Sequence, residues 1–576
     1  MKEFILEPTT LKLSNGEEEI LSFHFREEGE QEIKVPSYHW NDRAKLLRDY
    51  NLILGLYEEY LVKVSNWLNR VHGIDYSYDY WRIIVGPWLY YFISIVFDRL
   101  ESIRISSEEY QIAYSKTPKY EVKDWVPLDF IDFNNLFYSE SWNAYIYSEI
   151  IKLTGFVPEK KTSHKLERVQ VKDKPNRKAF IKNLLFFLTR FTRNFSKKIM
   201  MIELDLPQKS LYRLLLRLRS FSFSYFVRVR PEDKDLNIDL RNIPLDKEKS
   251  EESIKALLDA LIPFNIPKSH IEIFKEIKDQ SKKIFPDKVR LVMTSNAYFS
   301  NEHFKTWIAE QKQSQTKLWV MVHGGHHGTA LFNGPGKLTE DMADRFYSWG
   351  WDKFKLPSPK LSLQKKIKIK SRGKNILFIP YSVSRYSNHL DSSPIGESFY
   401  DCLKMHKRFF EKLENKDQGY TNNILFRLKS GFTPWDLEKE YYRLTGLKRF
   451  VYSDEESLID SIKKSELVIV TYDSTVFLES LTLNVPTCLF IRKEYWEMSK
   501  ASLKSFEKLH ACGVLHYDES SLTNHIMKVK SNYQAWWHSN DVQDSVSYFL
   551  QKFGLSSKDW EEDWYNEIYS HLCKID

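Results

Sequence analysis

The sequence predicts an α/β protein with two doubly wound halves, and three observations lead to that fold class. The chain has 576 residues, which is too long for one ordinary hydrophobic core. The segment Leu467–Phe490 reads as a buried strand, a polar turn, a helix and a second buried strand, the repeating unit of a parallel sheet. Strand and helix patterns also alternate in two separate stretches, which begin at Lys288 and Asn375. Two such stretches predict two parallel sheets, each binding ligands at the carboxyl ends of its strands.

Helical patterns dominate the N-terminal part of the chain. Apolar residues at helical spacing predict helices at Asn41–Asn69, from about Tyr80 to Ile103, at Trp142–Leu153 and at Arg177–Arg190. The apolar run Ile83–Phe97 is flanked by charged residues and contains Gly86-Pro87. It is too short to span a bilayer comfortably, so we expect a buried helix. The Lys-rich segment Glu159–Asn176 has few apolar residues and predicts a surface loop.

The first alternating region follows these helices. Its expected elements are strands at Lys198–Leu204, Val289–Thr294 and Lys317–His323, and helices at Leu211–Leu218 and Glu302–Gln311. The aromatic segment Asp344–Asp352 comes shortly afterwards. Its rings either face a sugar-binding cleft or fill the core, and the pattern does not separate these alternatives.

A basic segment separates the two halves. Leu361–Lys374 contains six basic residues and no acidic ones, which predicts an interdomain linker. The second half follows with strands at Asn375–Ile379 and Asn423–Leu428 and helices at Ser398–Leu413 and Glu456–Lys464. We expect the helical, Trp-rich tail to cross back onto the first half. The expected divisions are residues 1–360, the linker 361–374, residues 375–545 and the returning helices 546–576.

Composition restricts the partners and the compartment. A net charge of +7 and a pI near 8.7 permit an anionic partner without requiring one, and we expect no nucleic-acid partner. The four cysteines are far apart and form no CxxC pair, which indicates a reducing compartment and no zinc knuckle. The N-terminus lacks the apolar stretch of a secretory signal. We therefore expect a cytoplasmic protein that is soluble or bound peripherally at the membrane surface.

The turn Thr471–Thr475 is the first candidate site. Asp473, Ser474 or Thr475 can cap the helix that follows, so that backbone N–H groups and the positive end of the helix dipole face the crevice. A phosphate would be held there without a lysine. The alternative is an ordinary cap that serves stability alone. Glu479, one turn into the helix, either binds ribose hydroxyls or lies on a solvated face.

The second candidate site is the loop His323–Gly328. It carries three histidines, His323, His326 and His327, and three glycines, Gly324, Gly325 and Gly328. Glycines allow a ligand to approach the backbone, and imidazoles exchange protons near neutral pH. A metal site is disfavoured because no HExxH helix or Cys cluster accompanies the histidines. The His-Gly-Gly sequence also resembles a hydrolase oxyanion hole, but the chain has no G-x-S-x-G elbow. A turn with surface histidines remains the structural alternative.

Further charged residues fall near the same predicted rim. Arg427 closes one strand of the second half, with Lys429 after it, and Arg385 and His389 follow the preceding strand. Carboxylate candidates in the first half are Asp344, Glu203 and Asp205. Walker A, GxGxxG and kinase motifs are absent, and no D-x-D stands in a context that would hold a nucleotide-bound metal. This combination favours a metal-independent transferase without a cofactor beyond its donor.

Several motifs, in order along the chain, resemble one known family. They are Trp40-Asn41-Asp42-Arg43, Tyr80-Trp81-Arg82, Gly86-Pro87-Trp88-Leu89, Asp98-Arg99, Trp142-Asn143, Ile262-Pro263, Ile266-Pro267-Lys268, Phe304-Lys305-Thr306-Trp307, His323-Gly324-Gly325 through Gly328, Asp344 through Trp349-Gly350-Trp351, Thr471 through Glu479, Asn484-Val485-Pro486-Thr487 and Trp536-Trp537. On these residues the chain resembles the transferases of bacterial O-antigen and surface-polysaccharide loci. Val322 and His327 depart from the family pattern, in which Gln and Tyr are usual, so donor or acceptor preference is expected to differ.

The resemblance implies a GT-B-like glycosyltransferase with two Rossmann-like domains that face a cleft, a helical N-terminal elaboration and a returning C-terminal helix. Relatives that transfer Kdo and pseudaminic acid imply a CMP-activated ulosonic or nonulosonic acid as donor, a glycan or lipid-linked glycan as acceptor, and retention of configuration. The donor phosphate would sit at Ser474-Thr475 beside Arg427, with His323, His326 and Asp344 across the cleft.

Two alternatives remain open at this point. One is a nucleotide-sugar epimerase or glycerol-phosphate polymerase of the same fold, which would share the phosphate site. The other is a non-catalytic assembly protein of a glycan locus, held at the membrane surface by the basic segments Leu361–Lys374 and Glu159–Arg177.

Overall fold

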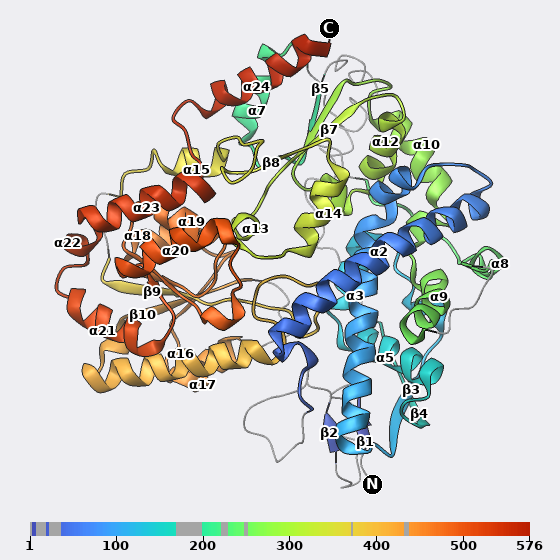
Figure 1. Ribbon diagram of the computed structural model, residues 1–576, viewed down its shortest axis with the longest axis horizontal. Helices are drawn as coiled ribbons and strands as arrows, with labels where there is room; N and C mark the ends of the chain where they lie inside the picture. Colours follow the sequence, from blue (N-terminus) through green and yellow to red (C-terminus); the bar gives the residue numbers. More distant parts are fainter. Residues whose placement is uncertain are drawn as a thin grey trace.

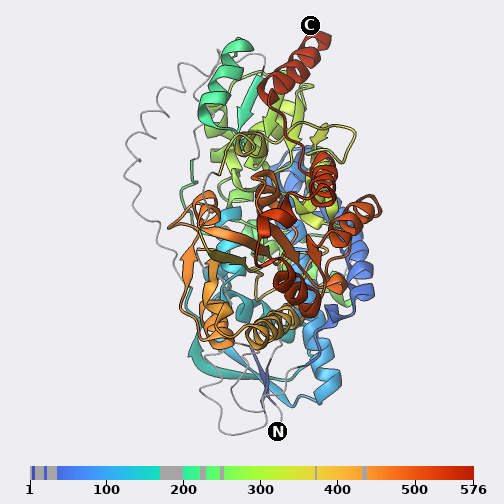
Figure 2. The same cartoon turned by 90° about the vertical axis from the view of Figure 1, so that its left-hand side faces the viewer.

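The structure is a computed structural model that describes residues 3–6, 19–21, 36–168, 199–220, 229–246, 252–369, 373–430 and 437–575. The predicted helix Arg177–Arg190 lies outside these residues. Figure 1 shows a helical N-terminal part, a smaller sheet above it and a larger sheet beside it. Strand β1 (Glu3–Ile5) and helix α24 (Trp560–Ile575) lie at opposite ends of the molecule (Figure 2).

Two long helices form the centre of the N-terminal part. Asp42 caps α2 (Arg43–His72) by accepting the N–H groups of Ala44 and Lys45, and Gly73 ends it in the left-handed conformation. The next helix, α3 (Tyr78–Tyr110), is the one described helix that is long and apolar enough to cross a membrane. However, 94% of its most apolar window is buried inside the protein. The structure therefore uses α3 as a core helix, as the sequence predicts.

Around these helices lie α4 (Phe130–Phe137), α5 (Glu140–Thr154) and a small parallel sheet of order β2-β1-β3-β4. Its strands after β1 are β2 (Glu19–Leu21), β3 (Tyr114–Lys119) and β4 (Glu159–Lys165). The surface loop predicted at Glu159–Asn176 is therefore wrong over its first part. The side chains of β4 are mostly exposed, so the segment lacks the apolar alternation that predicts a strand, and pairing with β3 decides its conformation.

The first of the two main sheets has the parallel order β5-β6-β7-β8. Its strands are β5 (Ile199–Ile202), β6 (Leu291–Thr294), β7 (Lys317–Met321) and β8 (Arg345–Tyr347). The helices of this half include α7 (Gln208–Arg217), α9 (Ser253–Asn265), α10 (Phe274–Ile284), α12 (Glu302–Lys312), α13 (His326–Thr329) and α14 (Gly334–Met342). Strand β7 ends before His323, which leaves the whole histidine loop beyond the carboxyl edge of the sheet.

The second main sheet has the parallel order β11-β10-β9-β12-β13-β14. Its strands are β9 (Asn375–Ile379), β10 (Ile424–Leu428), β11 (Phe450–Tyr452), β12 (Ser465–Val470), β13 (Thr487–Phe490) and β14 (Leu515–His516). Numbered within this half, the order is that of a Rossmann fold, with its switch point between β9 and β12. Neighbouring residues of β9 enter different cores, Leu377 on one face and Phe378 on the other, so both faces of the sheet are covered.

The helices of the second half are α16 (Glu397–Lys416), α17 (Leu437–Thr445), α18 (Leu458–Lys463), α19 (Thr475–Thr482), α20 (Lys500–Ala511), α21 (Glu519–Val529), α22 (Tyr533–Trp537) and α23 (Asn540–Phe553). Helix α24 then returns to the first half, where Glu561 accepts a hydrogen bond from Ser210 of α7 at 2.6 Å. Two facing Rossmann-like sheets with a returning C-terminal helix make up the GT-B arrangement. The predicted fold class is confirmed.

The segment between the two halves differs from the predicted linker. Residues Pro359–Gln364 form helix α15, in which Leu361 is completely buried and packs near α19. The first residues of the predicted linker, residues 361–364, therefore belong to a helix. Leu361 and Leu363 are spaced as in a strand and the lysines begin only at Lys365, so the basic composition of the whole segment hid its buried start.

Candidate functional site

The two segments that the sequence marks as candidate sites meet in the crevice between the sheets. The N–H of Gly325 donates to Thr475 Oγ1 at 3.2 Å. A Cβ added at Gly325 would lie 2.7 Å from Leu478 Cδ1 and 3.1 Å from the carbonyl carbon of Ser474. Figure 1 shows α13, which the first sheet carries, beside α19 and α20 of the second half. The loop after β7 therefore approaches the amino end of α19 so closely that a larger residue at Gly325 would have to displace Leu478 and the backbone of Ser474.

The amino end of α19 has the properties of an anion site. Ser474 is its N-cap, and the Ser474 hydroxyl accepts the N–H of Val476 at 3.3 Å. The first turn contains no acidic residue, so no carboxylate within the helix offsets the positive end of the dipole. The turn lies directly beyond β12, at the switch point of the second sheet. Ligands bind at this position in open α/β sheets.

His326 connects the two halves electrostatically. Its Nδ1 lies 3.7 Å from Asp473 Oδ2, and its ring meets that of Trp496 edge to face at 5.3 Å. Burial lowers the pKa of His326, but the carboxylates of Asp473, Asp391 and Glu497 outweigh burial, so the net shift is upward. Among the described residues, neither ring nitrogen has a hydrogen-bond partner. His326 is thus a largely enclosed imidazole that favours its charged form and keeps both nitrogens available.

The environment shifts the pKa of His323 in the opposite direction, downward. Desolvation by the surrounding protein lowers the pKa of His323, the charge of Asp205 opposes this shift and that of His327 adds to it. The side chain remains accessible to solvent. The pKa values of two histidines in one loop are thus shifted apart. The lowered pKa favours the neutral form of His323, and the raised pKa favours the charged form of His326. Asp205, which follows β5, is the predicted carboxylate that the structure brings near His323.

The remaining residues of the loop fix its shape. His327 Nε2 is 2.9 Å from Glu340 Oε1, and its ring stacks on Phe346 with centroids 4.8 Å apart. A Cβ at Gly328 would lie 2.3 Å from Trp351 Cδ2. These contacts all lie within the first half. They hold the loop so that His326 can face the second half.

A family model described as LIC12162 family transferase matches residues 22–568. The chain belongs to this family. Membership confirms the prediction that the protein is a transferase.

Solved structures resemble this LIC12162 family transferase weakly. A UDP-forming trehalose-phosphate synthase from Burkholderia xenovorans has a TM-score of 0.34 at 9% identity, covering 65% of this chain and 98% of its own. A trehalose-6-phosphate synthase, OtsA, has a TM-score of 0.31 at 10% identity, covering 51% and 76%. The S. aureus MnaA–UDP complex has a TM-score of 0.31 at 12% identity, covering 55% and 86%. No curated protein matches the sequence. The fold assignment above therefore depends on the strand order alone.

Asp344 of the LIC12162 family transferase lies far from its predicted place. Its carboxylate accepts the N–H of Leu318 at 2.8 Å and pairs with Lys312 and Lys317. Lys317 begins β7 and Asp344 precedes β8. Because both strands are parallel, Asp344 is at the amino edge of the sheet, and the histidine loop follows the carboxyl edge. The structure therefore does not bring Asp344 beside His323 and His326.

Glu479 is also engaged elsewhere. It is 3% exposed, one carboxylate oxygen accepts the side-chain amide of Gln364 at 2.8 Å, and the other pairs with Lys360. Both partners belong to α15. The structure therefore engages both carboxylate oxygens of Glu479 with α15, and the alternative of a solvated face is wrong. Glu479 fastens α19 to the segment between the halves.

The hydrogen bonds of the two predicted arginines go to other elements than α19, although the charge of Arg427 still acts on Tyr472, two residues before the N-cap Ser474. Arg427 donates to Ser461 Oγ at 2.7 Å and to the Glu456 carbonyl at 2.8 Å, and burial lowers its pKa. Arg385 donates to Glu140, the first residue of α5, at 3.2 Å. Both side chains are nearly buried and bind neighbouring elements. Arg427 does lie near the end of its strand, as predicted. Because side chains alternate between the faces of a sheet, its side chain points toward α18.

Sequence reasoning missed the residues that complete the surroundings of His326. Asp391 comes from the loop after β9, Glu497 and Trp496 come from the loop after β13, and Thr329 Oγ1 donates to Asp473. The sequence did contain one indication of these residues: both loops follow carboxyl ends of strands in the same sheet, where ligands bind. A single sequence gives no sign that loops over 100 residues apart converge on one histidine.

Several motif residues of the family resemblance brace this crevice from outside. Arg43 of α2 holds Glu497 through two hydrogen bonds, of 2.6 and 2.8 Å, and also donates to the Ser393 carbonyl at 3.1 Å. Arg99 of α3 donates to the Ser387 carbonyl at 2.9 Å. The helical N-terminal part therefore clamps two loops of the second sheet, the loop after β9 and the loop after β13.

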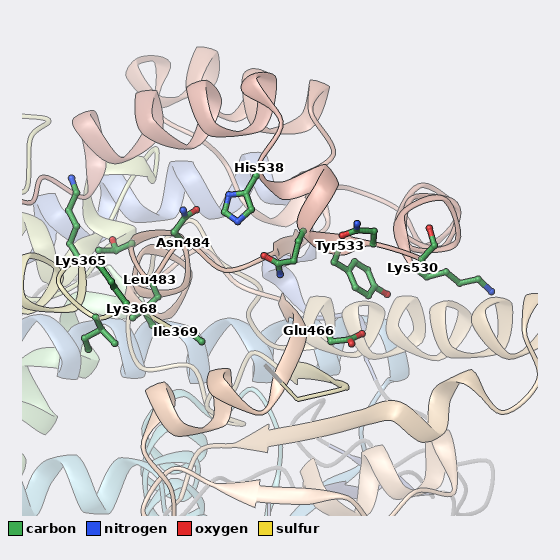
Figure 3. A pocket seen from close by; sticks show the side chains of 14 residues that line it. Lys365, Lys368, Ile369, Glu466, Leu483, Asn484, Lys530, Tyr533 and His538 are labelled. Atoms are coloured by element: carbon green, nitrogen blue, oxygen red, sulfur yellow. The ribbon is translucent and has the colours of Figure 1, made fainter. Parts of the chain in front are cut away.

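A cavity of about 710 Å³ lies at the other end of α19. Figure 3 shows that polar side chains line it, among them Lys368, Asn484 and His538. Thr482 and Leu483 at the carboxyl end of α19 also contribute. Neither Ser474 nor any residue of the histidine loop lines this cavity.

Proposed function

We propose that the chain is a glycosyltransferase that moves a sugar from a nucleotide donor to a glycan acceptor in the crevice between the two sheets. One observation carries the proposal: the histidine loop of the first half meets the amino end of α19 through Gly325 and Thr475. Transferase membership and the two facing Rossmann-like sheets agree with it. This arrangement sets proton-transfer groups against an anion site across one crevice.

The donor side of the proposed reaction is the amino end of α19. Backbone N–H groups and the helix dipole attract a phosphate there, and Ser474 and Thr475 offer hydroxyls. His326 lies beside this end of α19, because its Nδ1 faces Asp473, the residue before the N-cap Ser474. A protonated His326 would neutralise the charge that develops on the departing phosphate, where electrostatic stabilisation has its largest effect.

The acceptor side is His323. Its lowered pKa keeps the imidazole neutral near pH 7, as a general base requires. Asp205 is near enough to act on its charge and would stabilise the imidazolium that forms. For retention, the acceptor hydroxyl would approach the anomeric carbon on the same face as the departing phosphate. It would lose its proton to His323 as the bond to phosphate breaks beside His326.

For the finer specificity we propose a CMP-activated ulosonic or nonulosonic acid, transferred with retention to a surface glycan at the inner face of the cytoplasmic membrane. The support for this is the motif resemblance. We further propose that the nucleotide sugar is the one small molecule required, without a metal or other cofactor, because α19 and His326 supply the positive charge. The residues proposed at the donor are Asp473, Ser474 and Thr475.

Nucleotide binding tests the donor site. Calorimetry with CMP, UDP, GDP and dTDP should find one nucleotide that binds, and we expect CMP. The double variant Ser474→Ala/Thr475→Ala should weaken that nucleotide by about 10-fold or more, which corresponds to about 1.4 kcal/mol or the loss of one or two hydrogen bonds to a charged group. Ser457→Ala is the matched control, because Ser457 caps α18 in the same manner away from the crevice. Binding that is unchanged in the double variant contradicts the donor site.

Turnover separates the proposal from an epimerase of the same fold. Incubation with the nucleotide sugar alone should leave its sugar unchanged, and release of the nucleotide should require a glycan acceptor. Conversion of the donor sugar without acceptor would replace glycosyl transfer by epimerisation, with the same phosphate site.

A further inference from the structure

A second group of chemically active side chains lies within the larger sheet, away from the crevice. Cys488 of β13, His516 of β14 and His525 of α21 bring one potential ligand atom each within 4.8 Å of one another. Cys488 is completely buried, His516 is 3% exposed and His525 is half-buried. One thiol and two imidazoles, from three separate elements, therefore lie close together.

The surroundings of the cluster orient the two imidazoles. His516 Nδ1 is 2.8 Å from Ser521 Oγ, and its Nε2 is 2.9 Å from the Gly513 carbonyl. The thiol of Cys488 faces the same carbonyl at 3.8 Å. Metal-binding histidines commonly have their second ring nitrogen held by a neighbouring polar group, and Ser521 supplies such a group to His516.

The second imidazole, that of His525, has an unused nitrogen. Among the described residues, His525 Nε2 is buried without a hydrogen-bond partner. The ring is fixed by Trp536, whose centroid is 4.5 Å away. Gly513 has φ of +79°, and a Cβ there would lie 2.5 Å from His525 Cε1. A buried nitrogen that makes no hydrogen bond is costly, and a bound cation would remove that cost.

We propose that Cys488, His516 and His525 bind one zinc ion. A thiolate and two neutral imidazoles are ligands that zinc prefers, and a water molecule would complete a tetrahedral set. On binding, a zinc–sulfur bond forms and the Cys488 thiol releases its proton to solvent. His516 Nε2 would exchange its bond to the Gly513 carbonyl for a bond to zinc, and the ring proton would move to Nδ1, which then donates to Ser521 Oγ. The assignment does not depend on the glycosyltransferase proposal.

The role of the ion would be structural. Cys488 packs on the sheet face that also buries Phe490, Leu522 and Ile526, whereas the crevice lies at the carboxyl edge of the strands. An ion held by β13, β14 and α21 would tie the last two strands to the helix that covers them. Its removal should reduce stability more than it reduces affinity for nucleotide.

Metal content is the first test. The full-length protein, purified without chelators and dialysed, should contain about one zinc ion per chain by mass spectrometry of the metals. Cys488→Ser and His525→Ala should each lose most of it. Cys402→Ser is the matched control, because Cys402 is also a buried free cysteine but lies on α16. Zinc retained in Cys488→Ser, or lost equally in Cys402→Ser, overturns the proposal.

Cobalt provides a test on the unaltered chain, which matters if the variants fold poorly. After chelation, Co²⁺ added to the wild-type protein should give the visible absorption of a tetrahedral site and a sulfur-to-cobalt charge-transfer band. Added Zn²⁺ should abolish both and raise the melting temperature. Wild-type protein that binds neither ion at one equivalent shows that the cluster is an ordinary buried contact.

Discussion

Gly325 of the first half donates its N–H to Thr475 Oγ1 of the second half, at 3.2 Å and across 150 residues of sequence. This bond joins the histidine loop to α19, and a Cβ added at Gly325 would lie 2.7 Å from Leu478 Cδ1 and 3.1 Å from the carbonyl carbon of Ser474. Geometry in the crevice is therefore sensitive to a single methyl group.

Gly325→Ala should reduce transfer activity by about 100-fold. The new Cβ would displace the histidine loop, and a small misplacement of catalytic groups can reduce the rate by that factor. The melting temperature should change little, since the halves can separate slightly. Gly55→Ala is the control, because a Cβ at Gly55 in α2 meets nothing within 4 Å. It should keep full activity. Activity that is equal in the two variants would show that the close approach has no catalytic role.

The two histidines should give a bell-shaped dependence of kcat/KM on pH. The acidic limb reports protonation of His323, whose pKa is lowered below 6.5, and the alkaline limb reports loss of the proton from His326, whose pKa is raised above 6.5. Asp473→Asn removes a carboxylate that favours the charged imidazole, so the alkaline limb should move to lower pH. Glu340→Gln, beside His327, should leave that limb in place.

The raised pKa of His326 also makes the stability of the folded protein depend on pH. Because the pKa of His326 is higher in the folded than in the unfolded chain, its contribution is fully present below the unfolded pKa. It is lost as pH rises through the folded pKa. Urea unfolding between pH 6 and pH 9 should show a smaller fall with pH in His326→Asn than in the wild type. Parallel curves would contradict the assignment.

Arg43→Ala should lower the free energy of unfolding by about 1.5–3 kcal/mol, because it removes charge-assisted bonds in a mostly buried pair with Glu497. Arg43→Lys should recover little of this, since lysine cannot make the double contact. Arg104→Ala breaks the more exposed pairs with Glu101 and Glu108 and should cost about 0.5 kcal/mol. Chemical denaturation distinguishes the three variants.

Glu479→Gln tests the corrected role of that carboxylate. The change should leave nucleotide affinity within about twofold and lower stability by about 1 kcal/mol, because it weakens the contacts with Gln364 and Lys360. Calorimetry and urea unfolding on the same preparation measure both effects. A large loss of nucleotide affinity with unchanged stability would restore the ribose role.

Asp344→Asn should keep most of the transfer activity, because Asp344 lies at the amino edge of the first sheet beside Lys312 and Lys317. His323→Asn should reduce activity by about 10² to 10⁴, as expected for a general base. A steady-state assay with donor and acceptor compares them directly. Equal losses would mean that Asp344 acts on the site from a distance.

Much of the architecture was predictable because local patterns decide it. Strands such as Val289–Thr294 and Leu467–Val470 are short, apolar and bounded by polar turns, and burial on both faces requires that composition. The start of α2 was signalled by Asn41-Asp42, and Asp42 is its cap. Strand β4 and helix α15 were missed because their conformations depend on contacts with β3 and α19 and not on their own patterns.

The sequence by itself determined the two sheets, the turn that caps α19 and the glycine-rich histidine loop, since each is a local pattern with a direct physical cause. Only the tertiary structure decided what those segments do to one another. It placed Gly325 against Ser474, surrounded His326 with Asp473, Asp391 and Glu497, and removed Asp344 and Glu479 from the crevice. Charge and pKa depend on distances through space, and residues that are far apart along the chain set those distances only after the sheets have packed.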